Sequence, residues 1–153
     1  MISDKELLHG AALLVLLGGC RPLRIHLVEA SGVYAIDSPN TSLVLMLKYS
    51  SKPTSAWQFA FTEKDDRLLN ELRRTKPETT AILGLVCAKD GVCRLAVADL
   101  PTIGLRVGEL AGKAVSVSRR SGSSYRVHGP QRRPLGYTVP IGAWRELDMW
   151  DHQ

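Results

Sequence analysis

The stretch "SLVLMLKYSSKPTSAWQFAFT", residues 42–62, combines two different β-strand patterns. In its first half apolar side chains occupy both alternating faces, which is typical of a strand that is covered on both sides. In its second half Trp57, Phe59 and Phe61 alternate with small or polar residues, so only one face is apolar. We therefore expect a central, buried strand that ends near Lys48, followed by an amphipathic strand.

Toward the N-terminus the sequence predicts a helix and a β-hairpin. Residues 4–17 are apolar on nearly every side, and Ser3 and Glu6 form a capping box at the start of this segment. A buried helix is therefore expected. Residues 23–30 and 32–37 are short β-type segments separated by Ser-Gly, which favours a hairpin.

Toward the C-terminus the pattern continues with a second helix and another hairpin. Thr62 is a suitable N-cap for a helix over residues 63–76, which has acids in its first turn and basic residues at its end. Residues 79–88 form an apolar segment, and a Lys-Asp-Gly turn joins it to a strand at 92–97. These elements predict a second strand pair in the core.

The remaining residues predict a smaller, β-rich region. A short helical turn is expected within residues 98–110, a hairpin between 113–120 and 124–129, and a last strand at 135–139. Trp144 is expected to dock on the core or on a partner. The fold class is therefore α+β: one domain with a mixed sheet, an N-terminal helix, a central helix and a C-terminal β-hairpin region.

Composition and cysteine content favour an ordinary globular protein. Of 153 residues, 44% are hydrophobic and 23% are charged, which excludes disordered, collagen-like and coiled-coil chains. Cys20, Cys87 and Cys93 are an odd number without metal-ligand spacing, so neither a disulfide framework nor a zinc site is expected. This pattern favours a reducing compartment, the cytoplasm.

An alternative reading concerns Cys20. "LGGC" at residues 17–20 resembles a lipoprotein processing site after a short apolar segment, which would make Cys20 the first residue of an anchored protein. However, Asp4 and Glu6 stand where a signal peptide is positively charged. No apolar run approaches 18 residues, so a transmembrane helix is not expected.

The order of elements over residues 3–97 resembles the core of the restriction-endonuclease-like superfamily, the PD-(D/E)xK nucleases. This resemblance implies an acid on the second strand and an acid-x-Lys motif on the third, which together bind a divalent metal such as Mg²⁺ for phosphodiester cleavage. It assigns Asp37 as a catalytic residue and metal ligand, and Lys48 as the catalytic lysine.

The sequence departs from this motif at one decisive position. Met46 stands where the second acid belongs, and a thioether is a poor ligand for Mg²⁺. Glu6 or Glu29 would have to replace that acid. The alternative is that Lys48 extends into water from a strand end while Asp37 opens a turn.

A basic C-terminal region carries the formal net charge of +5. Residues 104–135 contain one acid, Glu109, and the following basic residues: Arg106, Lys113, Arg119, Arg120, Arg126, Arg132 and Arg133. We predict that DNA or RNA phosphates are bound by Lys48, Arg119, Arg120, Arg126, Arg132 and Arg133. Because arginine binds carboxylates equally well, a non-enzymatic module that binds an acidic protein partner is the alternative function.

Overall fold

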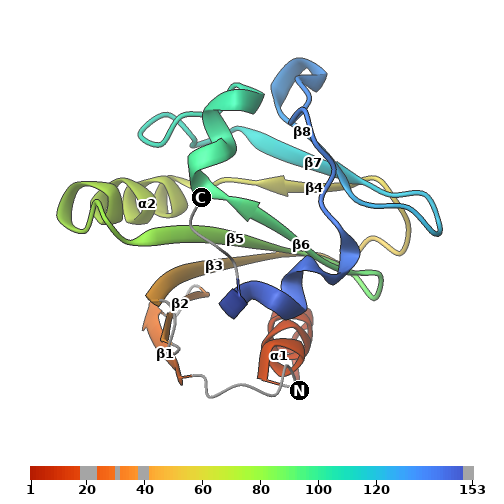
Figure 1. Cartoon of the computed structure of the whole chain (residues 1–153), viewed down its shortest axis with the longest axis horizontal. Coiled ribbons are helices and arrows are strands. Elements are labelled where there is room, and N and C mark those ends of the chain that lie inside the picture. The colour runs from red at the N-terminus through yellow and green to blue at the C-terminus, as the bar shows by residue number, and fades with distance from the viewer. Residues whose placement is uncertain (18–23, 30–31, 38–41, 150–153) are drawn as a thin grey trace.

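The computed structural model describes residues 1–17, 24–29, 32–37 and 42–149 (Figure 1). The strands are β1 (Arg24–Glu29), β2 (Val33–Asp37), β3 (Ser42–Ser50), β4 (Trp57–Ala60), β5 (Thr80–Cys87), β6 (Gly91–Ala96), β7 (Ala114–Ser118) and β8 (Arg126–His128). The helices are α1 (Asp4–Leu17) and α2 (Glu63–Thr75), and the 3₁₀ segments are η1 (Val97–Ile103), η2 (Pro130–Arg132) and η3 (Ile141–Met149). This is the expected α+β class.

The larger sheet has five strands in the order β1-β2-β3-β5-β6. β3 and β5 are parallel, in register from Leu43 opposite Thr80 to Ser50 opposite Cys87, and β4 and α2 form the connection between them. The other neighbouring pairs are antiparallel. β3 has five consecutive buried residues, which confirms the expected central strand.

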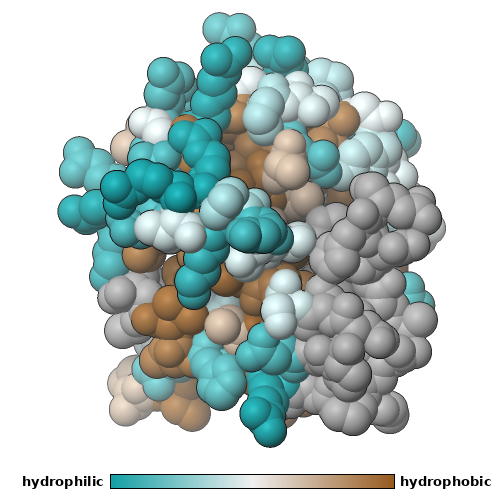
Figure 2. Space-filling view, turned by 60° about the vertical axis from the view of Figure 1, so that its left-hand side comes forward, coloured by the Kyte–Doolittle hydropathy of each residue, from teal (hydrophilic) through white to brown (hydrophobic). Residues whose placement is uncertain are grey.

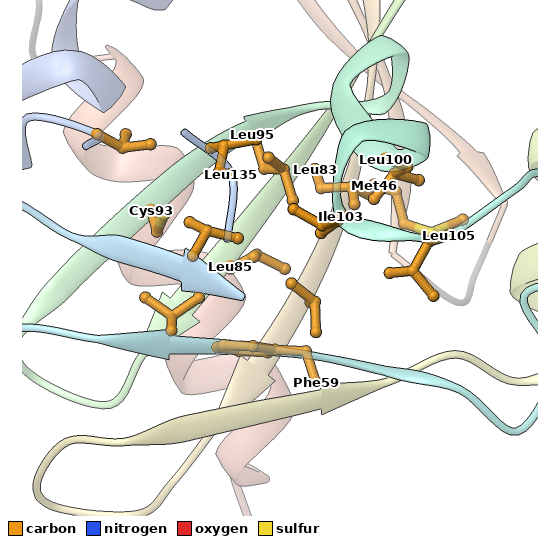
Figure 3. Packing of buried hydrophobic residues seen from close by; sticks show 14 of the residues in the cluster. Met46, Phe59, Leu83, Leu85, Cys93, Leu95, Leu100, Ile103, Leu105 and Leu135 are labelled. Carbon is orange, nitrogen blue, oxygen red and sulfur yellow. The ribbon is translucent and has the colours of Figure 1, made fainter. Parts of the chain in front are cut away.

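The smaller sheet has three antiparallel strands in the order β4-β7-β8 and packs on one face of the larger sheet (Figure 1). The layer between the sheets contains aromatic and aliphatic side chains from both, including Trp57, Phe59, Leu83 and Leu85, together with residues of η1 (Figure 3). The expected hairpin after residue 113 is present as β7 and β8. The amphipathic strand expected around Trp57 and Phe59 is β4, which belongs to this smaller sheet.

The opposite face of the larger sheet is covered by α1 and η3 (Figure 1). Trp144 of η3 is 1% exposed and donates a hydrogen bond from Nε1 to the Ala12 carbonyl oxygen of α1 at 3.0 Å. Gly84 of β5 makes room for this ring, because a Cβ there would lie 2.7 Å from it. The predicted docking of Trp144 on the core is confirmed.

Three expectations were wrong or lie outside the described residues. α1 is not buried on nearly every side, since it rests on one face of the sheet and leaves Leu7 and Leu14 57% and 70% exposed. Residues 135–139 form no strand and contribute a single bridge between Val139 and Tyr125. Cys20, the possible processing site, lies outside the described residues. No helix in the described part of the chain is long and apolar enough to cross a membrane.

Candidate nucleic-acid interface

The two residues assigned to a catalytic site, Asp37 and Lys48, lie at opposite ends of the β2-β3 pair. Asp37 is paired with Ser42 and accepts a hydrogen bond from its Oγ at 2.7 Å. Lys48 is six residues further along β3, a separation of roughly 20 Å at the rise of an extended strand. The structure therefore does not bring these two residues together at one site.

The position where the motif would hold its metal is apolar. On β2 the residue directly opposite Met46 is Val33, and both side chains are 2% exposed within the layer between the sheets. Mg²⁺ requires oxygen ligands, so these residues do not fit it. Glu6 hydrogen-bonds Ser3 at the start of α1, and Glu29 lies on the edge strand, which β2 separates from β3. No cluster of three or more potential metal ligands occurs among the described residues.

Lys48 has a specific partner that sequence reasoning missed. Its Nζ lies 2.5 Å from Asp65 Oδ2, and the two side chains are only 15% and 11% exposed. Asp65 also accepts the Thr62 backbone N–H and forms the capping box of α2 with that residue. The Thr-x-x-Asp pattern marks the helix start in the sequence. Only the packing of α2 beside β3 places Lys48 next to Asp65.

Arg119 is occupied by an equally specific contact. Its Nε and Nη2 donate to the Asp90 carboxylate at 2.8 and 2.6 Å, and the Tyr125 hydroxyl donates to the same carboxylate at 2.9 Å. The hydrogen bond from Arg119 lowers the pKa of Asp90 below its usual value, despite partial burial. This bidentate ion pair joins the β5-β6 turn to the end of β7. The Arg119 side chain is only 15% exposed, so it is not directed at solvent.

The outer face of the β4-β7-β8 sheet is open and carries small or polar side chains. Gln58, Ser116 and His128 stand in one cross-strand row, and Ser118 stands opposite Arg126 in the next. The intervening residues of each strand are buried against the larger sheet: Trp57, Phe59, Val115, Val117 and Val127. The strict alternation therefore leaves one face for packing and the other outside the layer between the sheets.

A groove of about 810 Å³ runs over this open face. Its basic lining residues are Lys113, His128 and Arg132, and no acidic residue lines it. Arg126 is exposed and shares a strand face with His128, so it lies beside the groove. Residues 111–143 contain six Lys or Arg residues and no Asp or Glu. Lys113 and Arg132 therefore give the groove lining a positive charge, and no acid in that lining offsets it.

The other predicted phosphate contacts lie elsewhere. Arg120 is exposed in the turn between β7 and β8. Arg133 extends toward Gly104, where an added Cβ would lie 3.5 Å from the arginine Cδ. The structure thus separates the predicted basic set: Arg132 lines the groove and Arg126 lies beside it, whereas the others lie elsewhere.

A second groove, of about 800 Å³, has an apolar floor. It lies beside the C-terminal half of α2 and is lined by Leu69, Leu72, Pro101 and Val107 among other residues. The charged residues around it are Arg73, Lys76, Arg106 and Glu109. Figure 2 views the molecule from the side of α2 and shows hydrophobic surface between hydrophilic side chains.

Comparisons with known proteins give a match by structure. No protein-family model and no curated protein sequence matches the chain. Among solved structures it is similar to Hjc, a Holliday junction resolvase from the archaeal hyperthermophile Archaeoglobus fulgidus. The identity is 12%, the TM-score is 0.52, and the match covers 99% of this chain and 100% of the resolvase chain. This likeness establishes the fold and not the activity. The chain therefore has the restriction-endonuclease-like fold that the order of its elements predicts.

Proposed function

We propose that this protein binds nucleic acid through the open face of the β4-β7-β8 sheet and does not cleave it by the metal-dependent chemistry of the motif. The observation that carries this proposal is the acid-free groove with Lys113, Arg126 and Arg132 around it. The likeness to a Holliday junction resolvase supports it at the level of the fold.

The chemistry of the groove suits a phosphate backbone. Lysine and arginine side chains neutralise phosphates and release the counterions that surround a nucleic acid. The short side chains of Ser116 and Ser118 let a sugar-phosphate backbone approach the sheet closely, and their hydroxyls can hydrogen-bond it. Arg126 and His128 have flat groups on the same face, on which an unpaired base can stack.

The proposal is tested by fluorescence anisotropy with single-stranded, duplex and four-way-junction DNA and with single-stranded RNA. The double variant Arg126→Ala/Arg132→Ala is expected to bind at least about tenfold more weakly, and the slope of log K against log salt falls by about 2. The matched control is Arg67→Ala/Arg145→Ala, which removes two charges from exposed positions on α2 and η3. Equal losses in both double variants would mean that net charge, and not the groove, attracts nucleic acid.

The apolar groove beside α2 favours a second candidate function, binding of a protein segment. Its apolar floor and its three basic neighbours suit a segment that combines apolar and acidic residues. Selection from a random peptide display library is expected to enrich such sequences, and Val107→Glu is expected to abolish their binding. If no sequences are enriched, or if Val107→Glu retains them, the groove is not a peptide site.

A further inference from the structure

A row of polar side chains crosses the middle of the open face of the β4-β7-β8 sheet. Gln58 stands opposite Ser116, which stands opposite His128 on the next strand. All three line the groove, with Gln58 exposed and the other two partly exposed. No side-chain hydrogen bond joins any of them to another described residue. Their amide, hydroxyl and imidazole groups can therefore hydrogen-bond a ligand in the groove.

The cations of this face stand on either side of the row. Arg126 is opposite Ser118 in the next cross-strand row. Lys113 precedes Ala114 at the other end of β7, and Arg132 follows β8, which runs antiparallel to β7 and therefore leads toward that same end. From Ala114 to Ser118, β7 spans roughly 14 Å at the rise of an extended strand. A backbone that crosses the face along β7 thus meets positive charge at both ends and hydrogen-bonding groups between them.

This arrangement suits a single strand better than a duplex. In a duplex the base edges lie within the grooves, which a protruding helix or two-stranded ribbon enters. A row of side chains across the face of a three-stranded sheet does not extend far enough to reach them. In a single strand the bases can turn toward the protein, and their hydrogen-bonding edges are exposed. The phosphates then remain near the basic side chains beyond the row.

We propose that this groove takes single-stranded nucleic acid, with the bases toward the row of Gln58, Ser116 and His128 and the phosphates toward the cations on either side. This inference rests on the proposed function and specifies its ligand. The amide of Gln58 presents an acceptor beside a donor, and each base has an acceptor next to a donor on its edge, so two hydrogen bonds can form with any base. The ring of His128 can stack on a neighbouring base. The row therefore contacts bases without selecting one of them.

The orientation of the strand is tested by fluorescence anisotropy with three ligands of equal length, made once as DNA and once as RNA. They are a single strand, its duplex, and the same strand with abasic sites in place of its central bases. The abasic strand keeps every phosphate, so its loss of affinity measures the base contacts alone. It is expected to bind about tenfold more weakly than the intact strand. Equal binding of the intact and abasic strands, or tighter binding of the duplex, overturns the proposal.

The role of Gln58 is tested with the same ligands. Gln58→Leu should weaken binding of the intact strand about fivefold, leave binding of the abasic strand unchanged, and not alter the slope of log K against log salt, because it removes no phosphate contact. Gln131→Gly is the matched control, since it removes an exposed amide that lines the same groove outside the row. The φ of 58° at Gln131 suits glycine, so this variant adds no backbone strain. It should bind both strands as the wild type does.

The two proposals fail in different ways. If Arg126→Ala/Arg132→Ala does not weaken binding of the intact strand, the proposed function is wrong. If that double variant weakens binding of every ligand, while Gln58→Leu affects the intact and abasic strands equally or not at all, the groove contacts phosphates only. In that case the proposed function stands and the inference about the bases is wrong.

Discussion

Arg119 donates two hydrogen bonds to the Asp90 carboxylate and thereby joins the smaller sheet to the β5-β6 turn of the larger one. Tyr125, buried in the layer between the sheets, donates a third hydrogen bond to the same carboxylate. An arginine that the sequence groups with the nucleic-acid contacts thus connects the two sheets. Arg132, which lines the groove, and Arg126 beside it form no ion pair with other described residues.

The first prediction concerns this connection. Asp90→Asn removes the charge that Arg119 and Tyr125 contact, so the midpoint of thermal unfolding should fall by about 5 °C at pH 7. The pKa of Asp90 is depressed in the folded state, so its stabilisation is present above the unfolded value near 3.9 and is lost as pH falls through the folded value. Differential scanning calorimetry should show the two proteins converging below about pH 4. A constant difference down to pH 2 would contradict this role.

The second prediction concerns His9 and the pH dependence of stability. Its folded pKa of about 4 lies below the ordinary value of 6.5, so between these values the unfolded chain binds a proton that the folded chain does not. Stability should therefore rise from pH 4 to pH 6.5, by up to about 3 kcal/mol. Urea unfolding of the wild type and of His9→Gln checks this, because the variant should lack most of the rise. His26→Gln is the control, since that residue is exposed on the edge strand.

The third prediction concerns the start of α2. Asp65→Ala removes both the capping hydrogen bond with Thr62 and the contact with Lys48, and should lower the free energy of unfolding by about 2 kcal/mol. Lys48→Met should cost less, because Asp65 keeps its capping partner. Glu63→Ala, an exposed acid in the same first turn, is the control and should stay within about 0.5 kcal/mol of the wild type. Denaturant titration followed by circular dichroism measures all three.

The fourth prediction concerns metal ions and the apolar motif position. Removing divalent ions with EDTA at constant ionic strength should leave nucleic-acid affinity unchanged, because the described residues around Met46 offer no oxygen ligands. Mg²⁺ or Mn²⁺ should not produce cleavage of the bound strand. Asp37→Ala should alter neither result, since this residue lies far from Lys48. Cleavage that needs a metal and is abolished by Asp37→Ala would contradict this prediction and support the nuclease assignment.

A fifth prediction tests whether the motif position belongs to the core. Met46→Glu places a carboxylate in the layer between the sheets, where it has no partner, and should destabilise the protein by about 3 kcal/mol or more. Met46→Leu conserves volume and polarity, and should cost less than about 1.5 kcal/mol. A tolerated glutamate would mean that water or an ion reaches this position.

Local patterns predicted most of the secondary structure. The α1 helix has the bounds expected from its capping box and apolar run, and β3 is the central strand that its two apolar faces indicated. The hairpin of β7 and β8 follows from its alternation around a Gly-containing turn. The element order also led to the correct fold. These features depend on residues that are close in sequence, so the sequence alone determined them.

The functional assignments depended on contacts between distant segments. Asp37 and Lys48 both belong to the expected strands, yet the antiparallel register places them at opposite ends of the pair. Lys48 meets Asp65 because α2 starts beside β3, and Arg119 meets Asp90 because the two sheets pack together. Whether a charged side chain is occupied, neutralised or free to bind is set by these long-range pairings. The sequence by itself therefore determined the elements, their order and a basic C-terminal region, whereas only the tertiary structure decided which of its charges surround a groove.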